Sequence, residues 1–176
     1  MAGGNAMSTA PRLSVELKTT DAACVAYISM TGPYAQIPAA FGRLYAWVGG
    51  HGLVPAGMPS GVYLTDPAEG EATARWELHA PLAGDHPDAP PDASGLGIKH
   101  VPPHLVASAT YRGPYERIAP AYAEMAAWLR TNGYAVNGAP EEVYFSEPTT
   151  PPEDTLTEIR FPVAKAQGTK GVPLVK

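Results

Sequence analysis

The tripeptide Gly32-Pro33-Tyr34 returns 81 residues later as Gly113-Pro114-Tyr115, and this return decides the fold. No gap is needed from Gly32 to Leu82 to keep tryptophan, tyrosine and glutamate in phase between the two segments. The chain holds 20 prolines, which raise the background of chance matches, so the aromatic and acidic matches are the informative ones. The matched pairs include Trp47 and Trp128, Gly52 and Gly133, Val62-Tyr63 and Val143-Tyr144, Glu77 and Glu158, and Pro81 and Pro162. Self-similarity at a fixed offset indicates an internal duplication.

Each copy has the same expected order of elements, which is strand, helix, strand, strand. Apolar runs bounded by turn residues predict the strands, and the Gly-Pro-Tyr tripeptide ends the first of them. In the first copy Phe41, Leu44, Tyr45 and Val48 recur at helical spacing, which predicts a helix that ends at Gly52. The expected strands cover residues 24–30, 62–65 and 73–81, then 105–111, 143–146 and 155–163, with leading strands at 13–18 and 96–99.

The two copies predict one α+β domain made of duplicated βαββ units, with a small-molecule groove between the units. The segment that joins the copies is rich in Pro, Asp and Gly, so we expect it to be exposed and mobile. Both ends of the chain lack periodicity and are expected to be loose, the first of them disordered. The expected boundaries are 1–12 for the N-terminus, 13–82 for repeat 1, 83–95 for the linker, 96–163 for repeat 2 and 164–176 for the tail.

Composition limits the classes of partner. The 176 residues are 45% apolar and carry a formal net charge of -5, and lysines and arginines are scattered. Nucleic acid needs a clustered basic face, so it is not an expected partner. The first ten residues have no basic and apolar signal pattern, and no apolar run is long enough for a membrane span. We therefore expect a cytoplasmic protein with no membrane partner, as a monomer or weak homodimer.

The sequence predicts no metal and no cofactor. Cys24 is the single cysteine and lies in an apolar run, which favours a buried, inert thiol and excludes an intrachain disulfide. His100 and His104 flank Pro102-Pro103 and have no cysteine or acidic residue at ligand spacing. The chain also lacks a phosphate-binding glycine loop and a dinucleotide fingerprint.

Glu158 is the strongest candidate for chemistry. Alternation along residues 157–161 places Glu158 and Arg160 on the strand face opposite Ile159. Glu77 is the equivalent residue of the first copy, and two carboxylates in one groove could act as acid and base. The competing interpretation is that both are ordinary glutamates on the sheet surface, with Glu158 paired to Arg160.

Aromatic residues are the other candidates. Tyr63 and Tyr144 alternate against aliphatic neighbours, so we expect them on the glutamate face, where their rings would hold a flat cation. Tyr144 could also donate a proton to a leaving group. For the remaining rings both a ligand-contact role and a packing role stay open, and they are Tyr34, Tyr115, Trp47, Trp128 and Tyr111.

The phrase Val25-Ala26-Tyr27-Ile28, the two Gly-Pro-Tyr tripeptides and the closing segment 158–163 resemble the GyrI-like small-molecule-binding family. That family includes the effector-binding domains of AraC-type and MerR-type multidrug regulators, and the resemblance covers about residues 13–163. It implies a curved antiparallel sheet with both helices on one face and a groove for aromatic and cationic drugs. It also implies that Glu158 pairs with the cation. Twelve N-terminal residues cannot encode a helix-turn-helix segment, so a transcription factor is not expected.

Three functions from different classes follow. The first is sequestration of, or resistance to, amphipathic, aromatic or cationic small molecules that bind in the acidic, aromatic-lined groove. The alternative is a hydrolase of strained electrophilic toxins that uses Glu158, Glu77 and Tyr144, which the resemblance to some family members implies. The third, less favoured, is a protein-interaction role such as gyrase inhibition.

Overall fold

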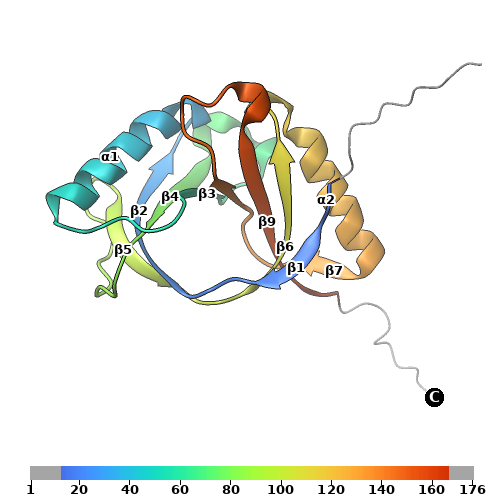
Figure 1. The fold of residues 1–176 in the computed structure, drawn as a ribbon, viewed down its shortest axis with the longest axis horizontal. Helices are drawn as coiled ribbons and strands as arrows, with labels where there is room; N and C mark the ends of the chain where they lie inside the picture. Colours follow the sequence, from blue (N-terminus) through green and yellow to red (C-terminus); the bar gives the residue numbers. More distant parts are fainter. Residues whose placement is uncertain (1–12, 167–176) are drawn as a thin grey trace, which may run out of the picture.

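The computed structural model describes residues 13–166, so the expected loose ends at 1–12 and 167–176 lie outside the described residues. One antiparallel sheet runs through the whole domain, with α1 near one end and α2 near the other (Figure 1). The predicted α+β class is confirmed. Repeat 1 contributes β2 (Ala23–Thr31), α1 (Ile37–Gly50), β3 (Ser60–Tyr63) and β4 (Arg75–Pro81). Repeat 2 contributes β6 (Leu105–Arg112), α2 (Ala119–Asn132), β8 (Glu141–Tyr144) and β9 (Leu156–Lys165).

The order of the strands repeats as the duplication predicts. The main path through the sheet is β1-β6-β9-β8-β3-β4-β2-β5, so each repeat pairs its three strands in the same way and β3 meets β8 at the centre. The short strand β7 (Tyr134–Val136) pairs with β9 and was not predicted. Its counterpart in repeat 1 is the single bridge between Pro55 and Leu82.

The leading strands exchange partners between the repeats. Strand β1 (Glu16–Thr19) precedes repeat 1 but pairs with β6 of repeat 2, and β5 (Leu96–Val101) precedes repeat 2 but pairs with β2 of repeat 1. Each repeat therefore completes its sheet with a strand from outside its own βαββ unit. This exchange ties the two units together at both outer edges of the sheet.

The helices begin and end for the predicted local reasons. Each has a proline in its first turn, Pro38 in α1 and Pro120 in α2, where the missing N–H breaks no helical hydrogen bond. Gly52 and Gly133 follow the helices with φ of 69° and 78°. Glycine adopts this left-handed conformation without the steric penalty of a side chain, so it ends the helix without backbone strain.

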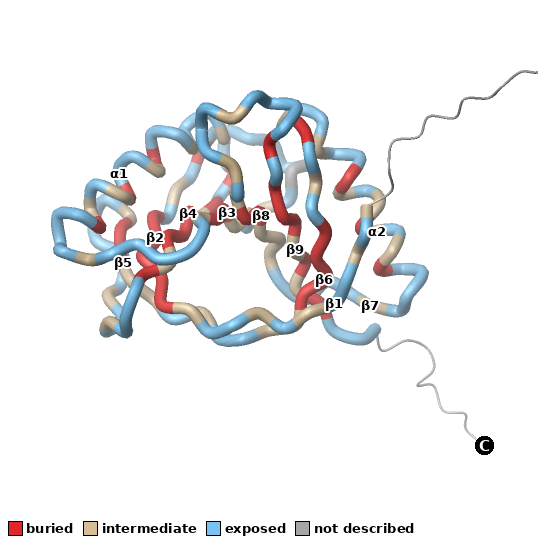
Figure 2. Tube along the Cα trace, viewed as in Figure 1, coloured by how far each residue is buried: buried red, intermediate tan, exposed pale blue. Residues whose placement is uncertain are grey.

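Two apolar cores lie between the helices and the sheet. Ala40, Leu44 and Val48 of α1 pack on repeat 1, and Ala121 and Met125 are among the buried residues of α2 that pack on repeat 2. Buried positions run along the strands and recur along the inner side of each helix (Figure 2). Burial of these aliphatic side chains is the main force that holds each helix on the sheet.

One row of side chains crosses the sheet beneath both helices. Direct strand partners point to the same face of a sheet, so the partners can be followed from strand to strand. The row runs through Ile28, Leu78, Gly61, Glu142, Ile159 and Ala109. Its ends belong to the cores beneath α1 and α2, so both helices cover one face and the row's centre lies between them.

Gly61 and Glu142 mark the symmetry axis of the molecule. They are separated by the repeat offset and are also direct partners in the ladder between β3 and β8. A residue pair that satisfies both conditions lies at the pseudo-two-fold axis that relates the repeats. The axis therefore passes between a glycine and a glutamate, where the two copies differ most in chemistry.

Among the residues that the structure describes, no helix is both long and apolar enough to cross a membrane.

Candidate functional site

Glu142 is a buried carboxylate at the centre of the sheet. Its residue is only 8% exposed, and it occupies the helix-facing row whose other members are Gly61 and apolar residues. None of the Lys, Arg and His side chains within residues 13–166 forms an ion pair with it. Burial of an ionised group without an opposite charge is costly, so its hydrogen-bond partners decide what it can do.

Three tyrosine hydroxyl groups surround this carboxylate. Tyr122 of α2 donates a hydrogen bond to Oε2 at 2.5 Å, and Tyr144 donates one to Oε1 at 3.1 Å. Tyr63 lies 3.4 Å from Oε1, and its hydroxyl shares a 2.5 Å hydrogen bond with the hydroxyl of Tyr144. We call Glu142, Tyr63, Tyr122 and Tyr144 the Glu142 cluster. Both repeats supply it, because Tyr63 and Tyr144 are equivalent positions of the duplication.

Further rings enclose the Glu142 cluster. Tyr34 meets the ring of Tyr63 edge to face at 5.5 Å, and Phe41 and Tyr115 meet the ring of Tyr144 in the same way at 6.1 and 5.9 Å. Tyr115 is 47% exposed, so the ring set reaches from the buried carboxylate to solvent. Edge-to-face rings around an acid present both faces and edges to a flat guest.

The surroundings of the Glu142 cluster favour the protonated, neutral form of each of its four side chains. Burial raises the pKa of Glu142 above its ordinary value, although hydrogen bonds from Tyr122, Tyr144 and Tyr63 oppose the rise. Burial and the nearby Glu142 carboxylate raise the pKa of Tyr63 and of Tyr122. The pKa of Tyr144 is also raised, by burial first and then by Tyr63 and Glu142. The phenols therefore stay protonated donors, and the carboxyl accepts a proton more readily than an exposed glutamate does.

A glycine makes room for this arrangement. A Cβ atom added to Gly61 would lie 2.9 Å from the Tyr144 hydroxyl oxygen and 3.1 Å from that of Tyr63. The hydroxyl pair thus occupies the space that a side chain of repeat 1 would fill. Glu142 from repeat 2 and the vacant side-chain position of Gly61 in repeat 1 together form the centre of the site.

The structure places Glu158 and Glu77 on the other face of the sheet. Glu158 accepts hydrogen bonds from Ser108 at 2.6 Å and from Arg160 at 2.9 Å, and forms an ion pair with Lys18 at 2.7 Å. Glu77 pairs with Lys99 at 2.5 Å and with His79 at 2.9 Å. The predicted alternation of Glu158 against Ile159 is confirmed, and so is its contact with Arg160.

These partners make both glutamates strongly acidic. Partial burial alone would raise the pKa of Glu158, but hydrogen bonds from Arg160, Lys18 and Ser108 outweigh it and lower the pKa to about 2. Burial likewise opposes the contacts of Glu77 with His79 and Lys99, which lower its pKa to about 2. Carboxylates that already have cationic partners have less to gain from a cationic guest than Glu142 has.

The expected meeting of Glu158 with the tyrosines is wrong. In the strand pairing Tyr144 lies opposite Thr157, and Tyr63 lies opposite Trp76, so both rings point to the helix-facing side. Glu158 lies one position further along β9, and that single step puts it on the opposite face. Tyr144 and Tyr63 remain in the candidate site, but their acid is Glu142.

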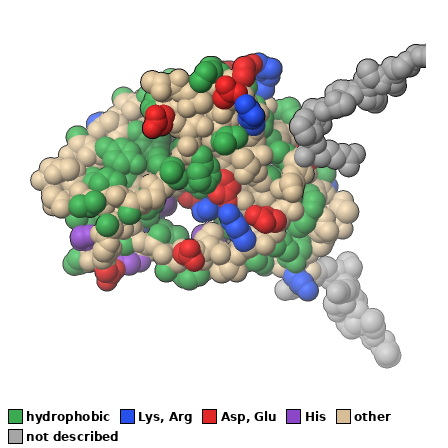
Figure 3. Space-filling model, viewed as in Figure 1, with side chains coloured by type: hydrophobic (Ala, Val, Ile, Leu, Met, Phe, Trp, Pro, Cys, Tyr) green, Lys and Arg blue, Asp and Glu red, His purple; other side chains and the backbone are tan. Residues whose placement is uncertain are grey.

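A groove does lie between the repeats on the face of Glu158. It has a volume of about 480 Å³, and Lys18, His79, Glu141 and Arg160 are among its lining residues, whereas Glu158 is not. The space-filling view shows a hollow between the repeats with acidic and basic side chains at its edge (Figure 3). The partners of Glu158 therefore reach this groove, and Glu158 itself lies behind them.

The remaining predicted rings divide between the site and the rest of the domain. Tyr34 and Tyr115 adjoin the Glu142 cluster, as an expected pocket rim would. The ring of Trp47 lies tilted against that of His51, and Trp128 stacks on Tyr134. Both tryptophans pack against the apolar cores beneath the helices. Tyr111 donates a hydrogen bond to the carbonyl oxygen of Pro114 at 2.7 Å, which favours a structural role.

The sequence analysis missed Glu142 and Tyr122. Glu142 lies two residues before Tyr144, and this spacing places both on one strand face. Tyr122 occupies the apolar stripe of the second predicted helix, at the position that Phe41 holds in the first. A search for positions where the two copies differ, rather than agree, would have found both residues.

The premise of the metal prediction also fails at one histidine. His100 of β5 is the direct strand partner of Cys24 in β2, although the two are far apart in sequence. Asp85 and Asp88 of the connecting segment accept hydrogen bonds from its two ring nitrogens, both at 2.6 Å. Spacing along the chain therefore did not exclude a thiol and acidic neighbours for His100.

One comparison with known proteins identifies a family, and another finds proteins of the same fold. A family model described as the GyrI-like small molecule binding domain matches residues 13–164. No curated protein matches the chain. Among solved structures, the EcmrR–DNA complex in EcmrR-RPo has a TM-score of 0.76 at 18% identity, over 88% of this chain and 58% of the other. The EcmrR C-terminal domain has a TM-score of 0.71 at 20% identity, over 88% of this chain and 99% of the other.

Two further structures share the fold at lower identity. A hydrolase from Listeria innocua has a TM-score of 0.63 at 17% identity, over 88% of this chain and 94% of the other. SAV2435 bound to tetraphenylphosphonium has a TM-score of 0.55 at 14% identity, over 86% of this chain and 94% of the other. At these identities the likeness concerns the fold alone.

Proposed function

The chain belongs to the GyrI-like small-molecule-binding domain family, and from this premise we propose that it binds aromatic or amphipathic cations at the Glu142 cluster. The observation that carries the proposal is a buried carboxylate whose hydrogen-bond partners are phenols. A cation beside Glu142 would supply the missing opposite charge. Sequestration of such a compound is the function that this chemistry fits best.

The rings supply the second part of the recognition. A delocalised cation gains about 0.5–2 kcal/mol from each aromatic face that it contacts, with the larger values in water-poor sites. Tyr34, Phe41 and Tyr115 adjoin the phenols of the Glu142 cluster and would provide such faces. A small hydrated ion such as sodium cannot use them, so selectivity for large aromatic cations follows.

Tetraphenylphosphonium is a suitable probe, because SAV2435, which has the same fold, has been solved with that cation bound. Glu142→Gln keeps the shape of the side chain and removes the charge. It should weaken tetraphenylphosphonium binding by about 1–3 kcal/mol, which is roughly 5- to 150-fold, as for other charge-assisted contacts. A neutral analogue such as triphenylphosphine oxide should bind the parent and the variant almost equally. Isothermal titration calorimetry measures both.

Glu158→Gln is the matched control, and it tests the original expectation for that residue. If Glu142 is the ligand acid, this change should leave the affinity for the cation within about twofold, because Glu158 already pairs with Lys18 and Arg160. The proposal is wrong if Glu158→Gln weakens the cation and Glu142→Gln does not. That outcome would return the site to the opposite face of the sheet.

Hydrolysis is a second candidate, and the raised pKa of Glu142 favours it. A protonated carboxyl is a general acid, and the shared hydroxyls of Tyr63 and Tyr144 could pass a proton to it. In a strained electrophile, water would add its oxygen to the carbon of the breaking bond. The carboxyl would give its proton to the leaving atom and regain one from the water. Single-turnover assays with a reactive cyclopropane should then show product with the parent and none with Glu142→Gln, at unchanged substrate affinity.

A further inference from the structure

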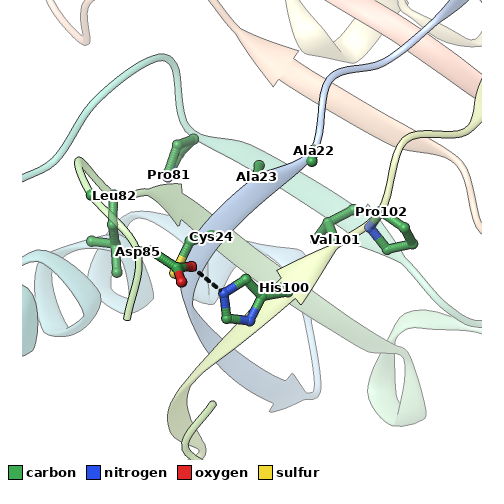
Figure 4. A pocket seen from close by; sticks show the side chains of 10 residues that line it. Ala22, Ala23, Cys24, Pro81, Leu82, Asp85, His100, Val101 and Pro102 are labelled. Carbon is green, nitrogen blue, oxygen red and sulfur yellow. Dashed lines mark hydrogen bonds and ion pairs between the residues drawn. The ribbon is translucent and has the colours of Figure 1, made fainter. Parts of the chain in front are cut away.

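A second cluster of reactive side chains lies away from the Glu142 cluster, at the outer edge of repeat 1. Strand β2 supplies Cys24, strand β5 supplies His100 and the connecting segment supplies Asp85. The close-up view shows the Cys24 sulfur and the His100 ring turned toward the Asp85 carboxylate between them (Figure 4). One ligand-type atom from each of the three residues lies within 4.8 Å of the other two.

The strand pairing fixes two members of this cluster. Cys24 and His100 are direct partners in the ladder between β2 and β5, so their side chains leave the same face of the sheet. The connecting segment then folds back along the outer edge of β5, where Ala89 exchanges two backbone hydrogen bonds with Ile98. This path of the connecting segment places Asp85 beside His100, with the Asp85 carboxylate 2.6 Å from His100 Nε2.

The other ring nitrogen of His100 has its own acidic partner. Nδ1 lies 2.6 Å from Asp88 Oδ1, so Nε2 is the nitrogen that faces Asp85. In metal sites a ligating histidine commonly donates its second N–H to a carboxylate, which fixes the ring and makes the ligating nitrogen more basic. Asp88 stands in that supporting position.

A pocket opens at the cluster. It has a volume of about 520 Å³, and its lining includes Cys24, Asp85 and His100 together with apolar residues such as Leu82 and Pro102. Cys24 forms the buried floor, while His100 and Asp85 have side chains that are 45% and 87% exposed. An ion can therefore reach the thiol from solvent past two exposed ligand side chains.

We propose that Cys24, His100 and Asp85 form a site for a transition-metal ion of the zinc type, with Asp88 as the supporting partner of His100. A thiolate, an imidazole and a carboxylate are all donors that bind zinc, and cobalt(II) accepts the same donors. Three protein ligands leave a fourth tetrahedral position for water or an incoming group. The Cys24 thiol loses its proton to solvent when the metal binds.

The geometry needs only a small adjustment. Around a tetrahedral zinc ion, with bonds of about 2.0–2.3 Å, neighbouring donor atoms lie about 3.3–3.7 Å apart. The present separations of up to 4.8 Å must shrink, and the 2.6 Å hydrogen bond between Asp85 and His100 must open. Asp85 is exposed and lies on a connecting segment, so a change of its rotamer can achieve both.

Without a metal, the same residues would form an ion-pair network in which a protonated His100 joins two aspartates. That network gives Cys24 no role, since within residues 13–166 the sulfur's one hydrogen bond is a 3.8 Å contact with the carbonyl oxygen of His86. The thiol therefore separates the two interpretations. Only metal binding engages the sulfur.

Cobalt titration of the metal-free full chain tests the proposal. We expect one equivalent to bind with a near-ultraviolet thiolate–cobalt charge-transfer band and the visible bands of tetrahedral cobalt. Zinc should displace the cobalt and raise the Tm of the protein, because it binds the folded state. Cys24→Ser, His100→Asn and Asp85→Asn should each weaken the metal at least tenfold, and Asp88→Asn by 10- to 100-fold through loss of support.

His104→Asn and His51→Asn are the matched controls, and neither should change the affinity or the spectrum. The proposal is overturned if cobalt binds without a charge-transfer band, if it binds His100→Asn as tightly as the parent, or if no stoichiometric binding occurs. His100 and Asp85 are exposed, so their variants keep the test decisive even if Cys24→Ser folds poorly. Glu142→Gln should bind zinc as the parent does, which separates this proposal from the one on cation binding.

Discussion

The two repeats share one backbone plan, but their side chains differ where the copies meet. Repeat 1 has Gly61, Phe41 and Trp76 at positions where repeat 2 has Glu142, Tyr122 and Thr157. At these three positions repeat 1 has a fully buried Trp76 and no carboxylate or hydroxyl group, whereas repeat 2 has a carboxylate and two hydroxyl groups. The two repeats therefore share one scaffold, and the carboxylate of the Glu142 cluster comes from repeat 2 alone.

The largest expected effect comes from replacing the largest fully buried side chain of repeat 1 with its repeat 2 equivalent. Trp76 is 0% exposed, and its indole N–H donates a hydrogen bond to the Gly32 carbonyl oxygen at 2.9 Å. Trp76→Thr should lower the free energy of unfolding by about 3–5 kcal/mol, because it removes a large buried ring and leaves a cavity. Urea denaturation measures the loss.

Trp128→Thr is the comparison variant for that prediction. Trp128 is only partly buried and lies on Tyr134 at the end of α2, so its loss should cost clearly less than the loss of Trp76. If both changes cost the same, repeat 1 is not the more tightly filled half. The asymmetry described above would then be confined to the Glu142 cluster.

A smaller effect should follow when the vacant side-chain position at the axis is filled. In Gly61→Ala the new methyl group would meet the hydroxyls of Tyr144 and Tyr63. We expect a loss of about 1–3 kcal/mol in the free energy of unfolding, as for other overpacked sites, together with weaker binding of tetraphenylphosphonium. Gly42→Ala in α1 has nothing within 4 Å and should be neutral or stabilising. Equal stability of the two variants would show that the side chains of Tyr63 and Tyr144 can move aside at no measurable cost in free energy.

The smallest effect should come from making the helices alike at their matched ring. Tyr122→Phe copies Phe41 and removes the 2.5 Å hydrogen bond to Glu142. It should cost about 1–2 kcal/mol of stability, because hydrogen bonds to a carboxylate are stronger than neutral ones. It should also raise the pKa of Glu142 further, since that bond lowers it. The pH at which the cation begins to bind should move upward.

Tyr111→Phe provides the reference for that change. It removes a hydrogen bond to a backbone carbonyl of the same repeat, far along the chain from Glu142. We expect a similar or smaller loss of stability and an unchanged pH profile of binding. A shift of the profile in Tyr111→Phe would mean that the profile reports stability rather than the protonation of Glu142.

The duplicated architecture was predictable because it depends on local signals. The Gly-Pro-Tyr breaks, the helix stripe, and the stops at Gly52 and Gly133 act within a few residues, and each has the expected form in the structure. The exchange of β1 and β5 between repeats was not predictable, because their partners lie far away in the chain. The sequence of a short apolar strand does not specify with which distant strand it pairs.

The acid of the site could not be assigned for a related reason. A strand turns its side chains to alternate faces, so an error of one residue in the alignment of two strands exchanges the faces. Tyr63 and Tyr144 were expected on the face of Glu158, but the strand pairing places them on the face of Glu142. Similarly, His100 was judged by its sequence neighbours, whereas its reactive neighbours come from β2 and from the connecting segment.

The protonation of the two acids distinguishes the faces of the sheet most directly. For Glu158 the pKa is lowered to about 2, so its contribution to stability is present above the ordinary value of 4.5 and is lost as the pH falls toward 2. For Glu142 the pKa is raised, so its ionisation opposes folding as the pH rises above 4.5. A bound cation should favour the ionised form of Glu142 and lower its pKa.

Carboxyl carbon NMR of the selectively labelled protein, titrated with and without tetraphenylphosphonium, tests the central claim that Glu142 is the ligand acid. Glu142→Gln and Glu158→Gln assign the two resonances. We predict that the free protein shows Glu142 titrating above 4.5 and Glu158 near 2, and that the cation lowers the pKa of Glu142 alone. The account is contradicted if Glu142 titrates at or below its ordinary pKa and the cation leaves that pKa unchanged, while the cation shifts the pKa of Glu158.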